Sequence, residues 1–346
     1  MDVFKRFLLL VSCFVICHIE KGLAQPARCV KGVNTVSGLK SIDIDDLKTR
    51  LGAKTIRYCI EIGGGVDQMS EAQYLLAFNQ MVDQFESELL PGLVANGIKA
   101  ILCLGSPPGG FVDRSSRLPQ HRIFSAPWAQ NTLKSIWEML AVRFKDHPNI
   151  VAFQLVSEPA VGSFIPVGLQ GWYDLQAELV NIVRSRVANK PIIVTSEYSQ
   201  ATRLSRIKLP ADSGQIWYAV HFYNPYKFLK QGIESRPYKI AYPSSSANLN
   251  MVLKSISRIT AFARKKRAQI VITEFSTTRF APKNSGLNYL QDVLALFKKN
   301  KFGWIYHAWR ESDYWSLELP AREDKPNASF TKRATTIKKY LRGSGC

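Results

Sequence analysis

Val151-Ala-Phe-Gln-Leu-Val-Ser-Glu-Pro159 joins a short apolar run to a carboxylate and a proline. Its first six residues predict a buried β-strand, because so apolar a run has no place on a surface. Pro159 disfavours helix at the residue before it, so we expect Glu158 at the mouth of that strand. Burial disfavours an ionised carboxyl, and a buried Glu158 could therefore stay protonated and act as an acid. A strand-end glutamate that only caps or pairs locally is the alternative.

The rest of the chain repeats this alternation of strand and helix. Further apolar runs with strand character cover 29–36, 54–60, 99–104, 191–196, 215–223, 269–275 and 302–309. Apolar residues at helical spacing cover 42–51, 71–96 with a break or kink at Pro91, 128–146, 172–187, 248–266, 288–299 and 331–341. Eight strands alternating with helices favour a parallel sheet, and their number favours an α/β fold closed as a single (β/α)8 TIM barrel. No GxGxxG follows the first strand, which disfavours a dinucleotide-binding sheet.

The N-terminal residues have the pattern of a secretory signal peptide. Lys5 and Arg6 precede an apolar run over 7–17, and small residues follow at 22–24. That run is too short to span a membrane. We expect cleavage after Ala24, which leaves residues 25–346 as one barrel domain that is secreted or periplasmic.

Four cysteines remain after this cleavage, and export makes a disulfide plausible. Cys29 and Cys346 are the preferred pair, because the two ends of a closed barrel tend to lie close together. Cys59 and Cys103 fall in successive strands, where small buried thiols are an equally good interpretation.

The chain is strongly basic, with a formal net charge of +19. Such a charge favours anionic partners, including an acidic polysaccharide. The basic residues gather in 264–267 and 332–342, where solvent-exposed helix faces explain them without a binding groove, so we expect no nucleic acid partner. His and Cys residues show no metal-ligand spacing. We expect no metal, no cofactor and a monomer.

Polar residues recur where the predicted strands end, and in a barrel these ends meet at one mouth. They are Arg57, Ser157, Glu158, His221, Tyr223, Glu274 and Trp309. Glu158 and Glu274 would point into one cavity, and glycoside hydrolysis requires two carboxylates with opposite roles. Arg57 and Tyr223 are groups that would keep Glu274 ionised. An aldolase-type barrel would need a lysine at a strand end, which none of these strands has.

The sequence resembles the cellulase-like glycoside hydrolases of family 5, in a clan of retaining β-glycosidases. The resemblance covers about residues 30–318 and rests on Lys31-Gly-Val-Asn34, Leu51-Gly-Ala-Lys-Thr-Ile-Arg57, Phe153-Gln-Leu-Val-Ser-Glu-Pro159, Val220-His-Phe-Tyr-Asn-Pro225, Val271-Ile-Thr-Glu-Phe275 and Trp304-Ile-Tyr-His-Ala-Trp309. It implies that Glu158 is the acid/base and Glu274 the nucleophile of an endo-acting enzyme on β-glucan or a related polysaccharide. By the same resemblance Arg57, His221 and Tyr223 would position and tune the two carboxylates, and Trp309 would stack under the sugar.

Two positions depart from the pattern of this family. The family has asparagine before the acid/base, where this chain has Ser157, and histidine at the end of the third strand, where this chain has Gly105-Ser106. A serine hydroxyl is shorter, so a water molecule or a shifted sugar could intervene. The alternative function is therefore a glycan-binding barrel with weakened or lost catalysis.

Overall fold

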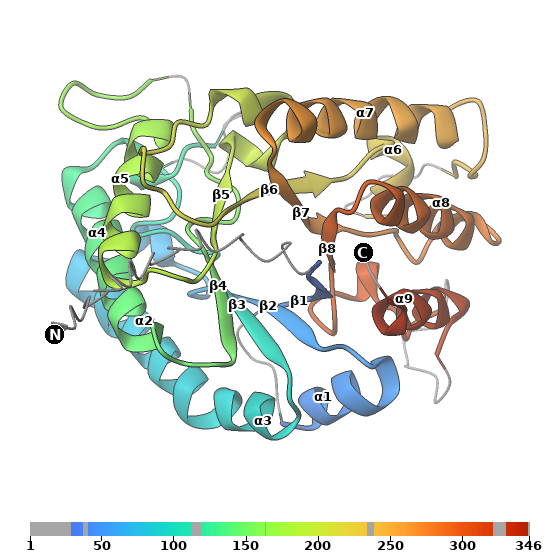
Figure 1. The fold of residues 1–346 in the computed structure, drawn as a ribbon, viewed down its shortest axis with the longest axis horizontal. Coiled ribbons are helices and arrows are strands. Elements are labelled where there is room, and N and C mark those ends of the chain that lie inside the picture. Colours follow the sequence, from blue (N-terminus) through green and yellow to red (C-terminus); the bar gives the residue numbers. More distant parts are fainter. Residues whose placement is uncertain are drawn as a thin grey trace, which may run out of the picture.

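The computed structural model describes residues 29–36, 41–112, 119–162, 164–233, 239–320 and 330–344. Its strands form a closed barrel in sequence order, with every neighbouring pair parallel and β8 paired to β1. Helices surround the strands on the outside (Figure 1). The predicted (β/α)8 TIM barrel is confirmed.

The strands are β1 Lys31–Val36, β2 Thr55–Ile60, β3 Lys99–Leu104, β4 Ile150–Gln154, β5 Ile192–Thr195, β6 Ile216–Phe222, β7 Gln269–Phe275 and β8 Gly303–Tyr306. The α-helices are α1 Ser41–Asp46, α2 Glu71–Gln84, α3 Leu90–Ala95, α4 Pro127–Phe144, α5 Trp172–Arg186, α6 Tyr226–Leu229, α7 Leu249–Lys266, α8 Ser285–Lys299 and α9 Lys332–Arg342. Short 3-10 or π segments are η1 Leu47–Leu51, η2 Val66–Gln68, η3 Phe85–Leu89, η4 Arg122–Phe124, η5 Glu197–Ser199, η6 Ala201–Arg206 and η7 Asp313–Trp315.

Two apolar layers hold the barrel together. A small cluster fills its interior and consists of Ile101, Ala152, Ile193, Ala219, Val271 and Ile305. A much larger cluster lies between the strands and the surrounding helices. Because side chains alternate along each strand, one set packs outward on the helices while the other points into the barrel. The inward residues nearest the carboxyl ends are polar, among them the buried Arg57 and Gln154.

The element boundaries differ from the predicted ones in two informative places. The predicted strand over 302–309 ends at Tyr306, and the His307–Ala308 peptide that follows is cis. The helix predicted over 71–96 is distorted before Pro91, at the π segment Phe85–Leu89. Proline has no N–H and clashes with the carbonyl four residues back, so the helix adjusts in the turn before it. The predicted end at Gly97 agrees with the positive φ of that glycine.

The cysteines agree in part with the predictions from the sequence. Cys59 and Cys103 are free and buried. Cys29 is disulfide-bonded, but Cys346 and the predicted signal peptide lie outside the described residues, so this pairing stays a prediction.

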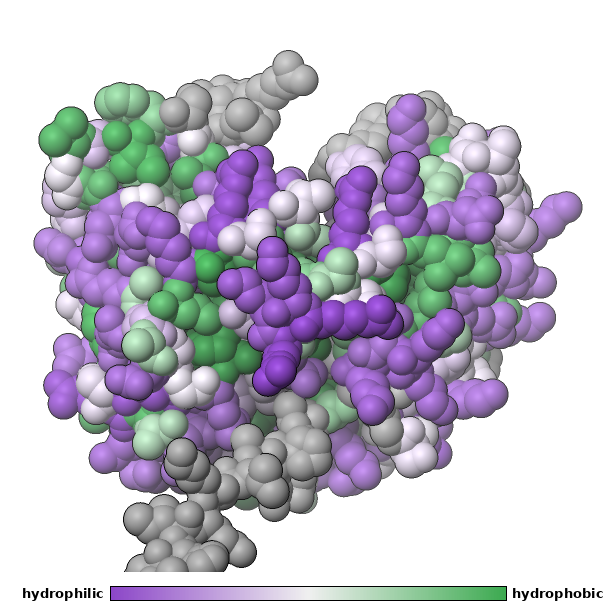
Figure 2. Space-filling model, turned by 45° about the horizontal axis from the view of Figure 1, so that its top comes forward, coloured by the Kyte–Doolittle hydropathy of each residue, from purple (hydrophilic) through white to green (hydrophobic). Residues whose placement is uncertain are grey.

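Residues 264–267 are exposed in the last turn of α7 and just after it, where cations complement the helix dipole. Hydrophilic side chains cover much of the face seen in Figure 2. Among the described residues, no helix is long and apolar enough to cross a membrane.

Candidate active site

Glu274 lies near the carboxyl end of β7, next to His221 of β6 in the strand register. Its Oε1 accepts a hydrogen bond from Arg57 Nη1 at 3.1 Å, and its Oε2 accepts one from the Tyr223 hydroxyl at 3.0 Å. His221 Nδ1 lies 3.4 Å from the same Oε2, and His307 Nδ1 lies 3.9 Å from it. Only 13% of the Glu274 side chain is exposed. Cations and donors thus surround this carboxylate.

These neighbours determine the ionisation of Glu274. Burial by itself would raise the pKa of this carboxyl, but its interactions with His221 and His307 oppose burial. The Arg57 guanidinium and the hydrogen bond from Tyr223 act in the same direction, and together they lower the pKa of Glu274 to about 2. The prediction that Arg57 and Tyr223 favour the ionised form agrees with this arrangement. Glu274 is a carboxylate at neutral pH.

Arg57 is wholly buried and ties the polar ends of several strands together. Its Nε donates to Gln154 Oε1 at 2.8 Å, and its Nη1 also donates to Asn34 Oδ1 at 2.5 Å. Its Nη2 donates to Ser157 Oγ at 2.6 Å. A buried guanidinium is tolerated when its donors are satisfied and a carboxylate balances its charge. Arg57 therefore positions Glu274 from below while holding Ser157 in place.

Glu158 follows β4 and has quite different surroundings. Its Oε1 lies 2.6 Å from His221 Nδ1, and 54% of its side chain is exposed. The expectation of a buried carboxyl was wrong, because the chain leaves the strand at Gln154 and the side chain reaches solvent. His221 Nε2 is buried without a hydrogen-bond partner, which favours the tautomer with its proton on Nδ1. One ring nitrogen thus stands between the two glutamates.

Three possible metal-ligand atoms lie within 4.8 Å of one another, one each from Glu158, His221 and Glu274. This spacing could hold a metal ion. A proton network explains the same spacing. Both carboxylates face His221 Nδ1, and Glu274 is additionally bonded to Arg57 and Tyr223. These contacts suit two carboxyl groups that share one hydrogen-bond donor.

Hollows open at the mouth on the two sides of β7. One, of about 590 Å³, begins at Glu158 and His221 and extends past Tyr198 and Tyr226. The other, of about 650 Å³, lies in the segment after β8 and includes Glu311. Glu311 Oε2 accepts a hydrogen bond from Asn34 Nδ2 at 2.8 Å, which connects this second hollow to the Arg57 network. Open space on both sides of the carboxylates can accommodate a chain longer than one sugar.

The comparison with known families agrees with this geometry. A family model described as cellulase, glycosyl hydrolase family 5, matches residues 25–313. The chain belongs to glycosyl hydrolase family 5. Predicted from motifs alone, this membership is confirmed.

Individual members of family 5 are distant from this chain. Endoglucanase C of Acetivibrio thermocellus is 22% identical over 234 residues, covering 59% of this chain and 66% of that protein. Endoglucanase C307 of a Clostridium species matches equally well. The chain thus spans just under two-thirds of the length of these curated relatives.

Solved structures show the same fold at still lower identity. Thermotoga maritima Cel5A, in a structure with cellobiose, is 17% identical with a TM-score of 0.69, covering 91% of this chain and 97% of that one. The cellulose synthase subunit Z of Clostridioides difficile is also 17% identical with a TM-score of 0.66, covering 91% and 100%. At this identity the likeness shows the barrel alone.

The first departure from the family-5 pattern now has a structural context. The Ser157 hydroxyl accepts from the buried Arg57, so it is turned toward the floor of the site. A short side chain held there cannot extend toward a sugar in the way that an asparagine amide can. The pocket floor at this position therefore differs from that of the family.

The second departure makes room for a carboxylate that the sequence analysis missed. A Cβ on Gly105 would lie 2.3 Å from Glu61 Cγ, so a larger residue there would displace the Glu61 side chain from the end of β3. Desolvation and then the Glu311 carboxylate raise the pKa of Glu61 to about 7, Arg57 opposes them, and Glu274 adds a smaller contribution, although the Glu61 side chain still reaches solvent. Glu61 follows β2 and Gly105 follows β3, and these two strands are neighbours in the barrel. This adjacency is the feature of the sequence from which Glu61 could have been predicted. The mouth is therefore more acidic than the sequence analysis predicted.

Trp309 does not have the position that its predicted role requires. Its side chain is 1% exposed and packs against Phe330, with the Arg310 guanidinium 4.7 Å from the ring centre. Because the ring is enclosed, it has no face for a sugar, and the stacking prediction was wrong. The apolar run over 302–309 continues past the end of β8, so hydrophobicity could not indicate which ring faces the mouth.

His307 faces the mouth instead. Its ring contacts Trp315 and Tyr223 at 6.1 and 6.5 Å between ring centres. The Lys230 ammonium lies 4.7 Å from the centre of the Tyr223 ring and 4.9 Å from that of Trp315. These rings form the aromatic wall beside Glu274, a name we use below for His307, Tyr223 and Trp315.

Proposed function

We propose that this chain is an exported, retaining endo-β-glycosidase that hydrolyses β-glucan or a related β-linked polysaccharide. The observation that carries the proposal is the pair Glu158 and Glu274 on either side of His221 Nδ1, with Glu274 hydrogen-bonded by Arg57 and Tyr223. Family membership and the endoglucanase names of its curated relatives support hydrolysis of a glucan.

The spacing of the two glutamates supports retention of configuration. Retaining enzymes hold their carboxyl groups about 5–5.5 Å apart, whereas inverting enzymes need about 6.5–9.5 Å to admit water. One carboxylate oxygen of Glu158 lies within 4.8 Å of one carboxylate oxygen of Glu274, which agrees with the shorter class.

The first step forms a glycosyl ester. The Glu274 carboxylate attacks the anomeric carbon while Glu158 gives its proton to the glycosidic oxygen, and the carbon–oxygen bond to the leaving sugar breaks. Glu274 suits attack because it is buried, ionised and fixed by two hydrogen bonds. Glu158 suits proton transfer because its exposed side chain can exchange protons with solvent and with His221.

In the second step the Glu158 carboxylate takes a proton from water. The water oxygen attacks the anomeric carbon, and the ester bond to Glu274 breaks. The sugar leaves with its original anomeric configuration, and both glutamates return to their starting states. Tyr223 and Arg57 stabilise the carboxylate that re-forms on Glu274.

A fluorinated substrate tests this assignment directly. A 2-fluoro β-glycoside with a good leaving group should form a stable ester, and peptide mass spectrometry should find that sugar on Glu274. A broad panel of glucans, mannans, xylans and acidic polysaccharides would identify the substrate by release of reducing sugar. A label on another residue would contradict the nucleophile assignment.

The second candidate function is glycan binding without turnover, favoured by the Ser157 hydroxyl that is held by Arg57. It predicts micromolar oligosaccharide binding, no reducing sugar from any polymer in the panel, and no ester on Glu274. Calorimetric titration with oligosaccharides, carried out together with the peptide mass spectrometry, distinguishes glycan binding without turnover from hydrolysis.

Export is proposed from the signal-peptide pattern of residues 1–24, and the disulfide at Cys29 supports an oxidising compartment. Expression of the full sequence in a secreting host should yield protein in the medium or periplasm that begins near residue 25, as read by N-terminal sequencing. Retention of residues 1–24 in the mature protein would contradict this part of the proposal.

A further inference from the structure

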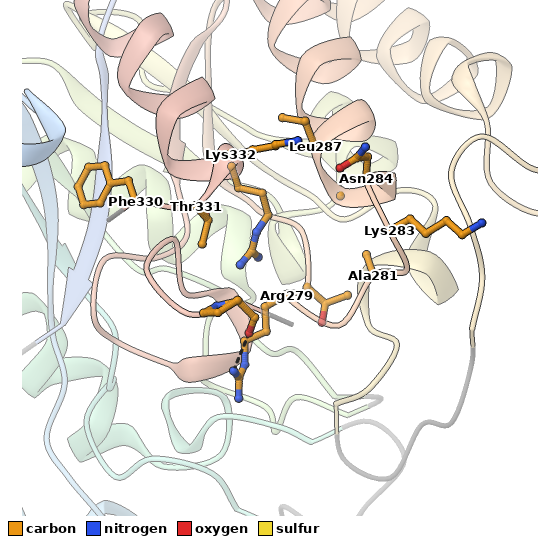
Figure 3. A pocket seen from close by; sticks show the side chains of 12 residues that line it. Arg279, Ala281, Lys283, Asn284, Leu287, Phe330, Thr331 and Lys332 are labelled. Atoms are coloured by element: carbon orange, nitrogen blue, oxygen red, sulfur yellow. Dashed lines mark hydrogen bonds between the residues drawn. The ribbon is translucent and has the colours of Figure 1, made fainter. Parts of the chain in front are cut away.

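A third pocket lies in the segments that follow β7 and β8. It has a volume of about 260 Å³, several times the roughly 30 Å³ that one water molecule takes in the liquid. Residues 278–287 line one side of it, and Pro320 with residues 330–333 line the other. Figure 3 shows Arg279, Lys283 and Lys332 among the side chains around it. None of the proposed catalytic residues lines this pocket.

The first turns of two helices border the pocket. Asn284 and Leu287 come from the start of α8, and Thr331 and Lys332 from the start of α9. Unpaired backbone N–H groups and the helix dipole make such ends favourable for anions. Neither helix has an acidic residue in its first turn. Lys332 and Arg333 instead open α9 with positive charge, which opposes the dipole.

The burial of the charged Arg333 side chain indicates that the pocket holds a ligand. This residue is only 8% exposed, and its Nη2 donates to Leu319 O at 2.7 Å. Its Nη1 is buried and has no hydrogen-bond partner. Burial lowers the pKa of Arg333, Tyr306 opposes this shift, and the nearby Arg279 adds to it. Among the described residues that line the pocket there is no carboxylate.

A buried guanidinium normally has a paired anion, because an uncompensated buried charge is strongly destabilising. An oxyanion in this pocket would face the N-terminal ends of α8 and α9 and would offset the charges of Arg333 and Lys332. Phosphate sites in barrels of this class often occupy this place, between the segments after the seventh and eighth strands. The place of the pocket in the barrel and the positive charges around it are thus two separate arguments for an oxyanion.

We propose that this pocket binds an oxyanion, a phosphate or sulfate group, at a site separate from the two glutamates. The group is either a free anion or a substituent on a sugar. Arg279 lines both this pocket and the hollow at Glu311, so a charged substituent on a bound polysaccharide lies within the same surface region.

Calorimetric titration of the intact protein with inorganic phosphate, at constant ionic strength, tests the proposal. We expect saturable binding of one phosphate, weakened at least tenfold by Lys332→Ala. Lys339→Ala is the matched control, because Lys339 is an exposed lysine of the same helix near its other end, and it should leave phosphate binding unchanged.

Asn284→Asp provides a second variant that does not depend on a buried residue. Its new carboxylate stands at the start of α8, where Asn284 makes no side-chain capping bond, and it should both weaken phosphate binding and raise the melting temperature. Hydrolysis by these variants should match the parent protein, which separates this proposal from the glycosidase proposal.

A sugar phosphate, glucose 6-phosphate, distinguishes the two sources of the anion. Tighter binding than inorganic phosphate, lost in Lys332→Ala, assigns the site to sugar-borne groups, and equal affinity assigns it to the free anion. No binding of phosphate or sulfate at millimolar concentration overturns the proposal, as does an equal loss of binding in Lys339→Ala.

Discussion

Glu274 and Glu158 face the same nitrogen of His221, yet their surroundings are opposite. Glu274 is 13% exposed and receives hydrogen bonds from Arg57 and Tyr223, whereas Glu158 is 54% exposed with His221 as its short contact. Identical carboxyl groups acquire different chemistry from burial and neighbouring charges. This barrel holds the proposed nucleophile in place with two hydrogen bonds and leaves the proposed proton donor in contact with solvent.

Glu274→Gln should have the largest effect, because it removes the attacking group. Turnover of the polysaccharide should fall by about 10⁴-fold or more. Added azide should restore part of the activity by replacing the carboxylate, and a glycosyl azide of inverted, α configuration should form, as judged by NMR. Activity at the parent level without azide would remove Glu274 from the mechanism.

Glu158→Gln should have a smaller and substrate-dependent effect, because the nucleophile remains. Loss of a general acid slows hydrolysis by about 10²–10⁴-fold for a sugar leaving group. A dinitrophenyl glycoside needs no proton to leave, so formation of its ester should be nearly unimpaired in pre-steady-state measurements. Equal losses on both substrates would show that Glu158 is not the acid.

Trp309→Ala and His307→Ala test the corrected aromatic wall. Loss of the buried Trp309 ring should lower the free energy of unfolding by about 3–5 kcal/mol and leave KM unchanged. His307→Ala should keep the stability and lower kcat by about tenfold or more, because it removes a group 3.9 Å from Glu274. Denaturant titration and steady-state kinetics check the pair, and Trp309→Phe serves if the alanine variant does not fold. A higher KM for a stable Trp309 variant would restore the stacking role.

The fold could be predicted because each strand is a short apolar run followed by polar residues. The Arg57, Tyr223 and Glu274 network could be anticipated for the same reason, since parallel strands bring their ends together. The exposure of Glu158 could not be predicted, because it depends on the residue at which β4 ends and on the direction of the segment that follows. Glu61 and His307 were missed because each matters only through a neighbour from another part of the chain, Gly105 in one case and Glu274 in the other.

The depressed pKa of Glu274 makes stability depend on pH. A carboxyl with a pKa of about 4.5 unfolded and about 2 folded contributes stability that is fully present above pH 4.5 and is lost as pH falls toward 2. Glu274→Gln cannot titrate, so its stability should change less than that of the parent protein over this window, by an amount on the order of a few kcal/mol. Chemical denaturation of both proteins from pH 6 down to pH 2.5 measures the difference. Parallel curves would mean that the groups around Glu274, His221 and His307 first among them, do not stabilise the carboxylate.

Glu61 has the opposite shift and should give the smallest effect. Its pKa is raised from 4.5 to about 7, so ionisation destabilises the folded state as pH rises from 4.5 through 7. Glu61→Gln should remove this loss and have a higher melting temperature than the parent at pH 8, with little difference at pH 4.5. Glu88→Gln, at an exposed position of η3, is the matched control and should show no such dependence. A Glu61 variant that follows the parent at both pH values would mean that neither desolvation nor the Glu311 carboxylate destabilises ionised Glu61. The acidic character that distinguishes this mouth would then have no energetic consequence.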